Sequence, residues 1–591
     1  MRRFVLGLGI ASVLIAGARA QTVPPVDPAY VKLVECSPII NRALVLAAGT
    51  HKFETRNLTG ATADTMLFLV GPTGATVGFN DDRVTPVTGQ SQFSSFLQAT
   101  TVAGAHQLIV ISQDNAKDGK CDVVVDGTTV LTQVAFGGAH VYWPWVTNDV
   151  FQTAHVATGA KTADTELYAF NGNTFVQRDG DGGVGLCSRL KMATPSTAGA
   201  KSQIIVGTHT DIPANRGQVR VVRNNLGKSP STGDNDGLSD ELERNTSFLN
   251  PNSSDSDGDG LPDDWELFGV QTNTGFVDLP AFGADPSIKQ AFFELDIMAA
   301  PPGKPANYFN ISSQAITLIQ NMFAAAGVQV IIDTGNLGTA ASRGGQTIPY
   351  QATFDNTSSK PTNVTILSKD PNFFAPERRR IFIYGVIGSN FTSPGVGGQA
   401  TQIIAPDGST GLRTFRNLQP IFMTCIQDGW PSATNQAHVT GHEMGHTIGL
   451  GHGGDVDTNG KPNYLSAMNY LYAYVGTDKS FVPSFSKGTR APIQENAAVE
   501  SAGIGTCTDY VYTIIARNYA KSSRRISTTQ PNAIDWNKNG ALDTAPVSYD
   551  VDPFDTFPQT LKDVDDGAVM ASRGFLWTAF AVNTPGYRSF K

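Results

Sequence analysis

The stretch HVTGHEMGHTIGLGHGG, residues 438–454, holds four of the nine histidines of this 591-residue chain. On a helix, His442 and His446 stand one turn apart on the same face, so both imidazoles point in one direction. Gly449 lies where the helix must end, because glycine tolerates the left-handed conformation that reverses the chain. The reversed chain can then bring His452 back beside the other two. The stretch therefore predicts a helix, a glycine turn and three converging imidazoles.

Three imidazole nitrogens are a ligand set that suits Zn²⁺, and a fourth position left open for water is typical of a catalytic zinc rather than a structural one. Glu443 lies beside the ligand face, where it can hold a water instead of the metal. His438 lies one turn upstream of His442, too far along the helix axis to share the ion, and we expect it to pack or to support the ligands. The expected zinc ligands are therefore His442, His446 and His452.

This pattern, H-E-x-x-H-x-x-G-x-x-H, resembles the signature of the metzincin clan of zinc endopeptidases. The clan also has a methionine turn beneath the zinc, and the segment LSAMNY places Met468 sixteen residues after His452. Tyr470 matches the M-x-Y of the astacin-like and serralysin-like members, which implies a tyrosine that ligates zinc at rest and stabilises the transition state. Gly453 fits none of the best-known subfamilies, so no subfamily is assigned. The resemblance covers about residues 286–480.

The resemblance implies a zinc-dependent endopeptidase that acts on proteins or peptides. Glu443 would be the general base, taking a proton from the attacking water and passing it to the leaving amine. The substrate would lie extended against the last strand before the helix, expected at residues 401–405. The alternative is a calcium-stiffened adhesin or surface-binding protein with a vestigial or structural metal site, although a structural ligand set has no need of Glu443.

The first twenty residues, MRRFVLGLGIASVLIAGARA, have the order of a secretory signal: two arginines, an apolar run and an Ala-Arg-Ala cleavage site. The run is too short to span a bilayer, and no later segment is long and apolar enough to be a membrane helix. We therefore expect a secreted, extracellular chain that starts near Gln21. Removal of residues 1–20 takes the formal charge from −9 to −12, and so acidic a chain disfavours nucleic acid as a partner.

Residues 21–228 alternate apolar and polar in short runs broken by Gly, Asn and Asp, a pattern typical of β-sandwich strands. ADTMLFLVGPTGATVGFNDD begins at Ala63, and the similar ADTELYAFNGNTFVQRDGDG begins at Ala163. We expect two all-β sandwich modules, at residues 21–140 and 141–228. The first copy resembles the pre-peptidase C-terminal β-domains found beside secreted bacterial proteases. That resemblance implies binding to surfaces or help in secretion, and a plain spacer is the alternative.

Residues 229–268 change character and form an acidic connector. DSDGDGLPDDWE carries side-chain oxygens at positions 1, 3, 5, 9 and 12 and glycine at 6, the spacing by which EF-hand-like loops wrap Ca²⁺. A second copy lies just before it, and the pair resembles thrombospondin type 3 repeats, which are calcium-stiffened connectors. A disordered acidic linker is the alternative. The expected calcium ligands are Thr232, Asp234, Asp236, Asp240, Glu243, Asp255, Asp257, Asp259, Asp263 and Glu266.

From residue 286 the pattern is α/β. Strands are expected at 291–298, 328–332 and 380–387, with a helix between the serines at 312 and Gly327. We expect one zinc metalloprotease domain at residues 286–591. A weaker third calcium-loop candidate in it has proline at the closing position; its residues are Asp535, Asn537, Asn539, Gly540 and Asp543. The expected fold class is multidomain, with all-β sandwich modules, a calcium-loop connector and a C-terminal α/β metzincin-like domain.

None of the five cysteines forms a C-x-x-C pair, so a cysteine zinc site is not expected. Export permits disulfides, and Cys36–Cys121 and Cys425–Cys507 would each stay within one expected domain. Spacing does not prove connectivity, and Cys187 would be left over.

Overall fold

The computed structural model describes a set of residues that begins after the expected signal segment. It comprises 26–83, 87–157, 163–180, 182–183, 187–209, 217–234, 236–337, 344–353, 367–379, 381–391, 397–400, 421–425, 432–473, 483–504, 533–552, 558–573 and 587–588. The expected signal peptide, the expected strand at 401–405 and Cys507 all lie outside this set.

The N-terminal part of the described chain consists of strands. They are β1 (Val31–Leu46), β2 (Gly49–Thr59), β3 (Thr65–Val70), β4 (Thr76–Asn80), β5 (Phe96–Thr101), β6 (Gly104–Ser112), β7 (Gly119–Val125), β8 (Thr128–Phe136), β9 (Ala139–Val141), β10 (Val150–Ala154), β11 (Thr165–Asn171), β12 (Thr174–Asp179), β13 (Arg189–Lys191), β14 (Ser202–His209) and β15 (Gly217–Asn224). Strands β5-β2-β7-β8 form one sheet, and the others form a larger branched sheet. The predicted mostly-β character with several sheets is confirmed.

Strand β1 is 16 residues long and pairs with strands from both halves of this region. Its first residues pair antiparallel with β15, its middle pairs parallel with β14, and its last seven residues pair antiparallel with β6. Residues on one strand therefore reach two separate cores. Cys36, near the start of β1, is buried in a core with Trp143 and Phe151, whereas Cys121 is buried in another with Phe53 and Leu67.

This arrangement contradicts the expected Cys36–Cys121 disulfide. Both residues are free thiols, and so is Cys187. The prediction was wrong because it assumed that residues 21–140 share one core, while β1 carries Cys36 away from the core that holds Cys121. Burial raises the pKa of the Cys121 thiol to about 12, which leaves it protonated and unreactive at neutral pH.

The two copies of the sequence repeat each form a β-hairpin. In the first copy β3 pairs antiparallel with β4, and in the second β11 pairs antiparallel with β12. Each hairpin begins directly after the Asp-Thr dipeptide's aspartate, because the first strand starts at the threonine. The strand–turn–strand order read from the repeat is present in both copies.

Short helices and strands follow in the connector. They are α1 (Asp240–Arg244), α2 (Asp263–Phe268), β16 (Val270–Thr272), β17 (Phe276–Val277) and α3 (Leu279–Phe282), and β26 (Tyr587–Arg588) joins β16 from the far end of the chain. Each calcium-type loop leads into one of the first two helices. Leu238 and Leu242 of the first loop and helix share a core with Leu267 and Phe268 of the second, so the two loops stand side by side.

The next layer is a mixed sheet with two helices. Its strands are β18 (Gln290–Met298), β19 (Gln329–Asp333), β20 (Thr347–Ile348), β21 (Phe382–Gly388), β22 (Gly398–Ala400) and β23 (Ile421–Cys425), and its helices are α4 (Ser313–Ala324) and α6 (Ala433–Thr447). The strand order is β19-β18-β21-β23-β22, parallel except for the antiparallel β22. The strands predicted at 291–298, 328–332 and 380–387 and the predicted helix are present, within two residues at each end.

Helices α4 and α6 pack on the sheet of this layer through one shared buried core. Ile319 and Phe323 of α4 and Met444 of α6 share the core with Phe292 and Phe293 of the sheet. Parallel strands buried on both faces read as nearly continuous apolar runs, which is why AFFELDIM stood out in the sequence. Among the described residues, the last strand before α6 is β23, which lies inside the sheet, and the edge strand on that side is β22.

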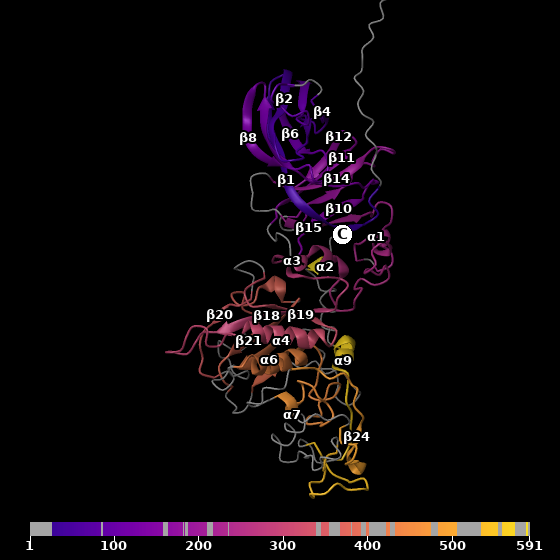
Figure 1. Ribbon diagram of the computed structural model, residues 1–591, viewed down its shortest axis with the longest axis vertical. Helices are drawn as coiled ribbons and strands as arrows, with labels where there is room; N and C mark the ends of the chain where they lie inside the picture. The colour runs from indigo at the N-terminus through magenta and orange to yellow at the C-terminus, as the bar shows by residue number, and fades with distance from the viewer. Residues whose placement is uncertain are drawn as a thin grey trace, which may run out of the picture.

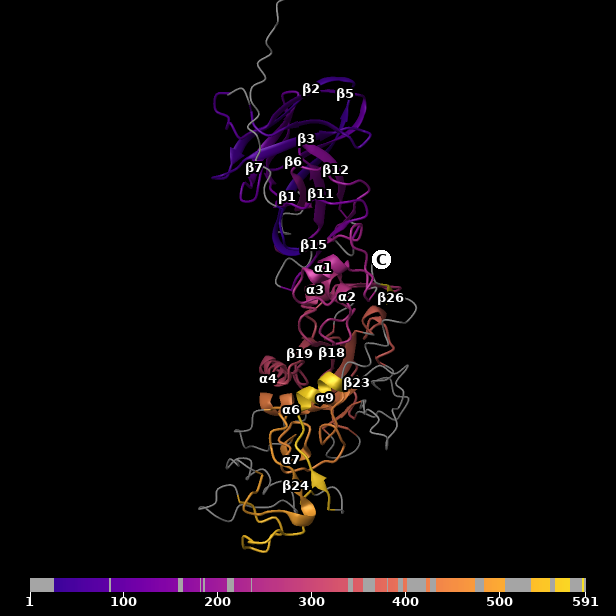
Figure 2. The same cartoon turned by 90° about the vertical axis from the view of Figure 1, so that its right-hand side faces the viewer.

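The described residues of the C-terminal part form few regular elements. Its elements are α7 (Tyr470–Ala473), β24 (Ile493–Gln494), β25 (Thr560–Leu561), α9 (Asp566–Arg573) and the 3₁₀ turn η2 (Glu495–Ala497), while the turn η1 (Pro376–Arg378) precedes β21. The molecule is elongated, with the N-terminal sheets at one end, α1–α3 next, the layer of α4 and α6 below them, and β24 near the other end (Figures 1 and 2). Helix α9 returns to lie beside the layer of α4 and α6 in both views.

Candidate functional site

Helix α6 carries two of the three histidines, His442 and His446. Ser432 caps its N-terminus by accepting a hydrogen bond from the Asn435 amide. The helix is buried from Gln436 to Thr447, so its histidine face lies inside the protein rather than in bulk water. Gly449 has a φ of +101°, which side-chain-bearing residues rarely adopt. The chain reverses there as predicted and brings His452 back towards the helix.

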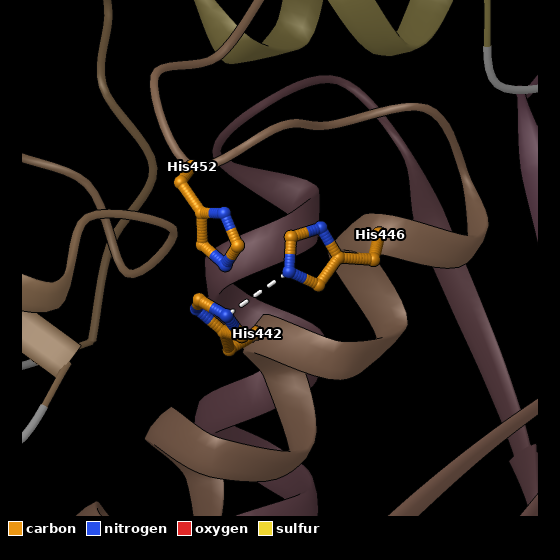
Figure 3. Close-up of side chains that lie close together, drawn as sticks. All are labelled: His442, His446 and His452. Atoms are coloured by element: carbon orange, nitrogen blue, oxygen red, sulfur yellow. Dashed lines mark hydrogen bonds between the residues drawn. The ribbon is translucent and has the colours of Figure 1, made fainter. Parts of the chain in front are cut away.

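The three imidazoles converge on one point (Figure 3). Nε2 of His442 lies 3.1 Å from Nε2 of His446. One ring nitrogen of each of these residues and of His452 lie within 4.8 Å of one another. Three of the expected site residues, from the helix and from the chain after the glycine turn, are thus brought together.

The Nδ1 atoms of the same rings are held from behind. Nδ1 of His442 contacts the Ala467 carbonyl at 2.8 Å, and Nδ1 of His446 contacts the Leu450 carbonyl at 2.7 Å. A carbonyl only accepts, so each Nδ1 carries the proton and each Nε2 keeps its lone pair. Nδ1 of His452 is held by the Asp457 carboxylate at 2.6 Å. These contacts are the kind that orient histidine ligands of metals.

Two nitrogen lone pairs at 3.1 Å repel each other unless a cation or a proton lies between them. Burial disfavours the proton: it lowers the pKa of His446 to about 4 and that of His442 well below its usual range. The remaining way to offset this repulsion is a bound cation, so the three histidines fit a metal ion. Neutral imidazole nitrogens suit Zn²⁺, and they also suit copper, iron and nickel ions.

Glu443 lies beside the triad and is buried. Its side chain packs on Gly398 of β22, where an added Cβ would lie 2.4 Å from its Oε1 atom. Only glycine leaves room for the carboxyl group there, so the edge strand approaches the helix closely. Burial raises the pKa of Glu443 to about 8. Gly398 was not recognised from the sequence, where it is one glycine of a glycine-rich stretch.

The segment with Met468 passes beneath α6. An added Cβ at Gly445 would lie 2.5 Å from the Met468 sulfur, so helix and turn are in close contact. Met468 is fully buried. The preceding residue, Ala467, supplies the carbonyl that holds His442. The turn therefore supports the histidine face directly.

Asp566, at the start of α9, anchors this turn. Its carboxylate accepts hydrogen bonds from the Tyr464 hydroxyl at 2.5 Å, the Ser466 hydroxyl at 2.6 Å and the Ser486 amide at 2.8 Å. The residue is fully buried. It lies about a hundred residues from its partners in sequence, and no local pattern identified it.

Tyr470 lies against the triad. Its ring centroid is 4.5 Å from that of His452 and 5.6 Å from that of His442. Burial raises the pKa of the phenol, with Glu443 and Asp457 acting in the same direction. The position two residues after Met468 thus brings this tyrosine to the histidine site.

His438 is not one of the three converging histidines. It is fully buried one turn upstream on α6, and burial lowers its pKa to about 3. The expected exclusion of this residue from the ligand set agrees with its position.

The structure explains the presence of glycine at position 453, the position that matched no subfamily. Nζ of Lys461 donates to the Gly453 carbonyl at 2.6 Å and to the Lys562 carbonyl at 2.8 Å. An added Cβ at Gly453 would lie 2.7 Å from the Lys461 side chain. The lysine is buried, which lowers its pKa to about 8. A glycine directly after the third histidine is therefore what lets this lysine fasten the loop.

The second calcium-type loop folds around its own carboxylates. The amides of Asp259 and Gly260 donate to Asp255 at 3.1 and 2.7 Å, and the Leu261 amide donates to Asp259 at 2.8 Å. One oxygen from each of Asp255, Asp257 and Asp259 lies within 4.8 Å of the others. The loop is compact, and its carboxylates face a common centre.

The closing glutamates of the two loops are buried, and within the described part of the chain neither oxygen of Glu243 or Glu266 has a hydrogen-bond partner. Burial raises the pKa of Glu243 to about 8, with Asp236 and Asp234 adding to it. Burial likewise raises that of Glu266 well above its usual range, with Asp259 adding to it. Buried acids that crowd one another without donors fit a cation among them.

The remaining expected calcium ligands lie in the same loops but differ in their contacts. Thr232 donates through its amide and its hydroxyl to Asp240 at 2.8 and 2.6 Å. Asp263 accepts from the Ser256 amide and hydroxyl at 2.9 and 2.6 Å. Asp240 and Asp263 thus lie in the loops but outside the groups of carboxylates within 4.8 Å of one another, which are Asp234, Asp236 and Glu243 in the first loop and Asp255, Asp257 and Asp259 in the second; Glu266 also lies outside them.

The weaker third loop folds in a similar way. The Gly540 amide donates to Asp535 at 2.9 Å, and the Ala541 amide donates to Asn539 at 2.8 Å, as at the equivalent positions of the second loop. Glu500 reaches the loop from a distant segment, but backbone amides occupy its carboxylate. The loop geometry alone does not indicate a bound ion.

Comparison with known proteins gives little. No family model matches the chain, and no curated protein matches it. Among solved structures, the chain is aligned with the CUB1-EGF-CUB2 domain of human MASP-1/3 over 33% of its own length and 99% of that chain, at 5% identity and a TM-score of 0.08. So low a score carries no argument about fold or function. Within the described residues, no helix is long and apolar enough to cross a membrane.

Proposed function

We propose that this protein is a secreted zinc-dependent endopeptidase. The observation that carries the proposal is the set of three converging histidines whose Nδ1 atoms are held from behind, with the buried Glu443 beside them. A structural ligand set gains nothing from an adjacent carboxylate, whereas hydrolysis needs a base there. The metzincin-like α/β domain, the choice of zinc and the export of the chain are parts of this proposal.

Zn²⁺, when bound, would lower the pKa of water towards 7 and polarise the scissile carbonyl. The protein's own residues supply the rest of the chemistry. His442, His446 and His452 would hold the ion through Nε2, because their Nδ1 atoms are engaged elsewhere. Glu443 accepts the proton of the attacking water and delivers it to the leaving amine. Tyr470 donates a hydrogen bond to the developing oxyanion.

Strand β22 is the surface on which an extended substrate would lie. Within the described residues it pairs with β23 alone, so its other edge has backbone groups available for a further strand. Addition of a peptide to such an edge is a recurrent mode of recognition. The contact between Gly398 and Glu443 supports this assignment, because it keeps this edge next to the base.

The other regions support the site from a distance. The connector loops would bind Ca²⁺ and hold the N-terminal sheets at a fixed distance from the histidine site. Those sheets would bind a surface or matrix near the substrate, or serve as a spacer. An adhesin with a structural metal site is the competing function, and Glu443 argues against it.

Incubation of the purified full-length protein with a peptide library tests the proposal. We expect cleavage with zinc bound in a one-to-one ratio, loss of cleavage with a zinc chelator, and recovery when zinc is restored. A zinc-loaded, folded protein that cleaves no member of the library would favour the adhesin. Cleavage that persists in the chelator would exclude a metal mechanism.

A further inference from the structure

A group of three carboxylates lies in the first β-hairpin, far from the histidine site and from the connector. Asp64 directly precedes β3, and Asp81 and Asp82 directly follow β4. The antiparallel register pairs Leu67 with Asn80, so the open end of the hairpin brings the three acids together. One oxygen of each lies within 4.8 Å of the others.

Asp64 is much less exposed than an acid on a protein surface usually is. It is only 5% exposed, and among the residues that the structure describes its Oδ1 atom has no hydrogen-bond partner. The Oδ1 atom of Asp81 is likewise buried and without a partner. The ammonium of Lys117 approaches the other oxygen of Asp64 at 3.9 Å, so this cation leaves the inward oxygen unsatisfied. A buried carboxylate oxygen without a donor is costly unless something absent from the protein itself binds it.

Electrostatics agrees with the geometry. Burial raises the pKa of Asp64 to about 7, with Asp81 and Asp82 adding to it and Lys117 opposing it. Burial also raises the pKa of Asp81 to about 6, where Asp82 adds and Lys201 opposes. The two lysines therefore do not offset the crowding of three acids.

We propose that Asp64, Asp81 and Asp82 form a divalent-cation site for Ca²⁺ in the first β-hairpin. Carboxylate oxygens are the ligands that hard divalent cations prefer. Ca²⁺ accepts six to eight oxygens in flexible geometry, whereas Mg²⁺ demands near-ideal octahedral positions. Three carboxylates from the two ends of a hairpin, with the exposed Asp82 open to solvent, match the looser requirement. The ion would fasten the open end of the hairpin.

The second copy of the repeat provides a natural contrast. Its register pairs Leu167 with Asp179, so Asp179 occupies the place of Asn80 in the first hairpin. The Asp179 carboxylate accepts hydrogen bonds from the amides of Gly182 at 2.7 Å and Arg189 at 2.8 Å. Backbone donors thus satisfy this acid, and a cation is not needed to do so.

The test counts bound calcium in the full-length protein. Protein stripped with EGTA is dialysed against Ca²⁺, and the ions bound per chain are measured for the parent and for Asp64→Asn/Asp81→Asn. We expect the double variant to bind one ion fewer while its circular dichroism spectrum is unchanged. Asp179→Asn is the matched control from the second copy, and it should bind as many ions as the parent. Excess Mg²⁺ should not displace the counted ion.

If the double variant does not fold, a single substitution of the exposed Asp82 provides the test. Asp82→Asn changes an exposed side chain and removes one of the three charged ligands, so we expect it to weaken this one site by about tenfold or more. Equal calcium numbers and equal affinities in the parent and in all folded variants would overturn the proposal, and so would displacement of the ion by Mg²⁺. The outcome is independent of the histidine site and of the connector, whose residues are unchanged in every variant.

Discussion

The histidine site and the connector loops are both groups of metal-ligating side chains, but the protein holds them in opposite ways. In the histidine site every ring has a second contact, and burial keeps His442 and His446 neutral. In the connector, the buried carboxylates of Glu243 and Glu266 lack hydrogen-bond donors and crowd other acids. The rings of the histidine site are held in position by contacts that do not involve the ion, whereas the connector acids crowd one another, which raises their pKa values and favours a bound cation.

The difference implies different consequences of losing the metal. Each imidazole of the histidine site keeps its Nδ1 contact when the ion is removed, so removing the ion should abolish chemistry and leave the fold largely intact. A set of carboxylates without counter-charge repels itself when empty, so removing its ion should loosen the segment. The predictions below test each half of this comparison.

The largest effect is expected from Glu443→Ala. The substitution removes the base but none of the imidazole contacts, so zinc content and thermal stability should stay near the parent values. Peptide hydrolysis should fall by about 10⁴-fold, because base, metal and water act as a unit. Zinc analysis, thermal unfolding and a fluorogenic peptide assay measure the three quantities. Activity within tenfold of the parent would contradict the assigned role.

Tyr470→Phe probes the same site more finely. It keeps the ring that packs on His452 and removes only the hydroxyl. If the hydroxyl stabilises the oxyanion, kcat should fall about 100- to 1000-fold with KM nearly unchanged. The matched control is Tyr472→Phe on the same helix, whose hydroxyl donates to the Pro462 carbonyl at 2.7 Å. The control should lose some stability and keep its kcat; an unaltered kcat in Tyr470→Phe would assign that tyrosine to packing.

Calcium removal tests the connector half of the comparison. Residues 229–268 should be cleaved by an added protease about tenfold faster in EGTA than in Ca²⁺ at ten times its dissociation constant. Glu243→Gln/Glu266→Gln replaces the two closing acids by neutral amides that bind Ca²⁺ poorly, so its cleavage rates with and without calcium should converge. Equal rates in the parent under both conditions would mean that the segment is an acidic linker without a bound ion.

The sequence predicted those features of the site that depend on local spacing. Helical periodicity placed His442 and His446 on one face, and the conformational freedom of glycine placed the end of the helix at Gly449. The structure has the helix and the glycine turn. The partners of the Nδ1 atoms could not be predicted, because two of them are backbone carbonyls whose residue type carries no signal. Asp457 is an exception, since an acid five residues after His452 could have been noticed.

Long-range features were missed or misjudged for a related reason. The Cys36–Cys121 pairing failed because β1 contributes to two separate cores, and no sequence pattern shows which partners a long strand will choose. Asp566 supports the methionine turn from about a hundred residues away. Such contacts depend on the tertiary course of the chain, which periodicity and turn chemistry do not determine.

The smallest effect is expected from Asp566→Asn, which tests whether the histidine site is built in advance by the turn beneath it. The amide can accept through one oxygen only, so one of the hydroxyls of Tyr464 and Ser466 loses its acceptor, at a cost of about 1–3 kcal/mol. Displacement of the turn would move the Ala467 carbonyl that holds His442, and kcat should fall a few-fold. Zinc affinity should fall with it, because the ring that carries the ligand is less well oriented.

A pH series tests which protonation state of Asp566 anchors the turn and whether kcat depends on that anchor. Burial raises the pKa of Asp566 to about 7. A carboxyl group whose folded pKa is raised contributes stability that is present below its unfolded pKa, near 4, and lost as the pH rises through 7. Asparagine does not titrate, so the stability gap between parent and variant should narrow from pH 5 to pH 8 in thermal unfolding. A gap that widens over this range would mean that the ionised carboxylate, with its three donors, is the favoured form. An unchanged kcat at every pH would show that the histidine site does not depend on the turn for its geometry.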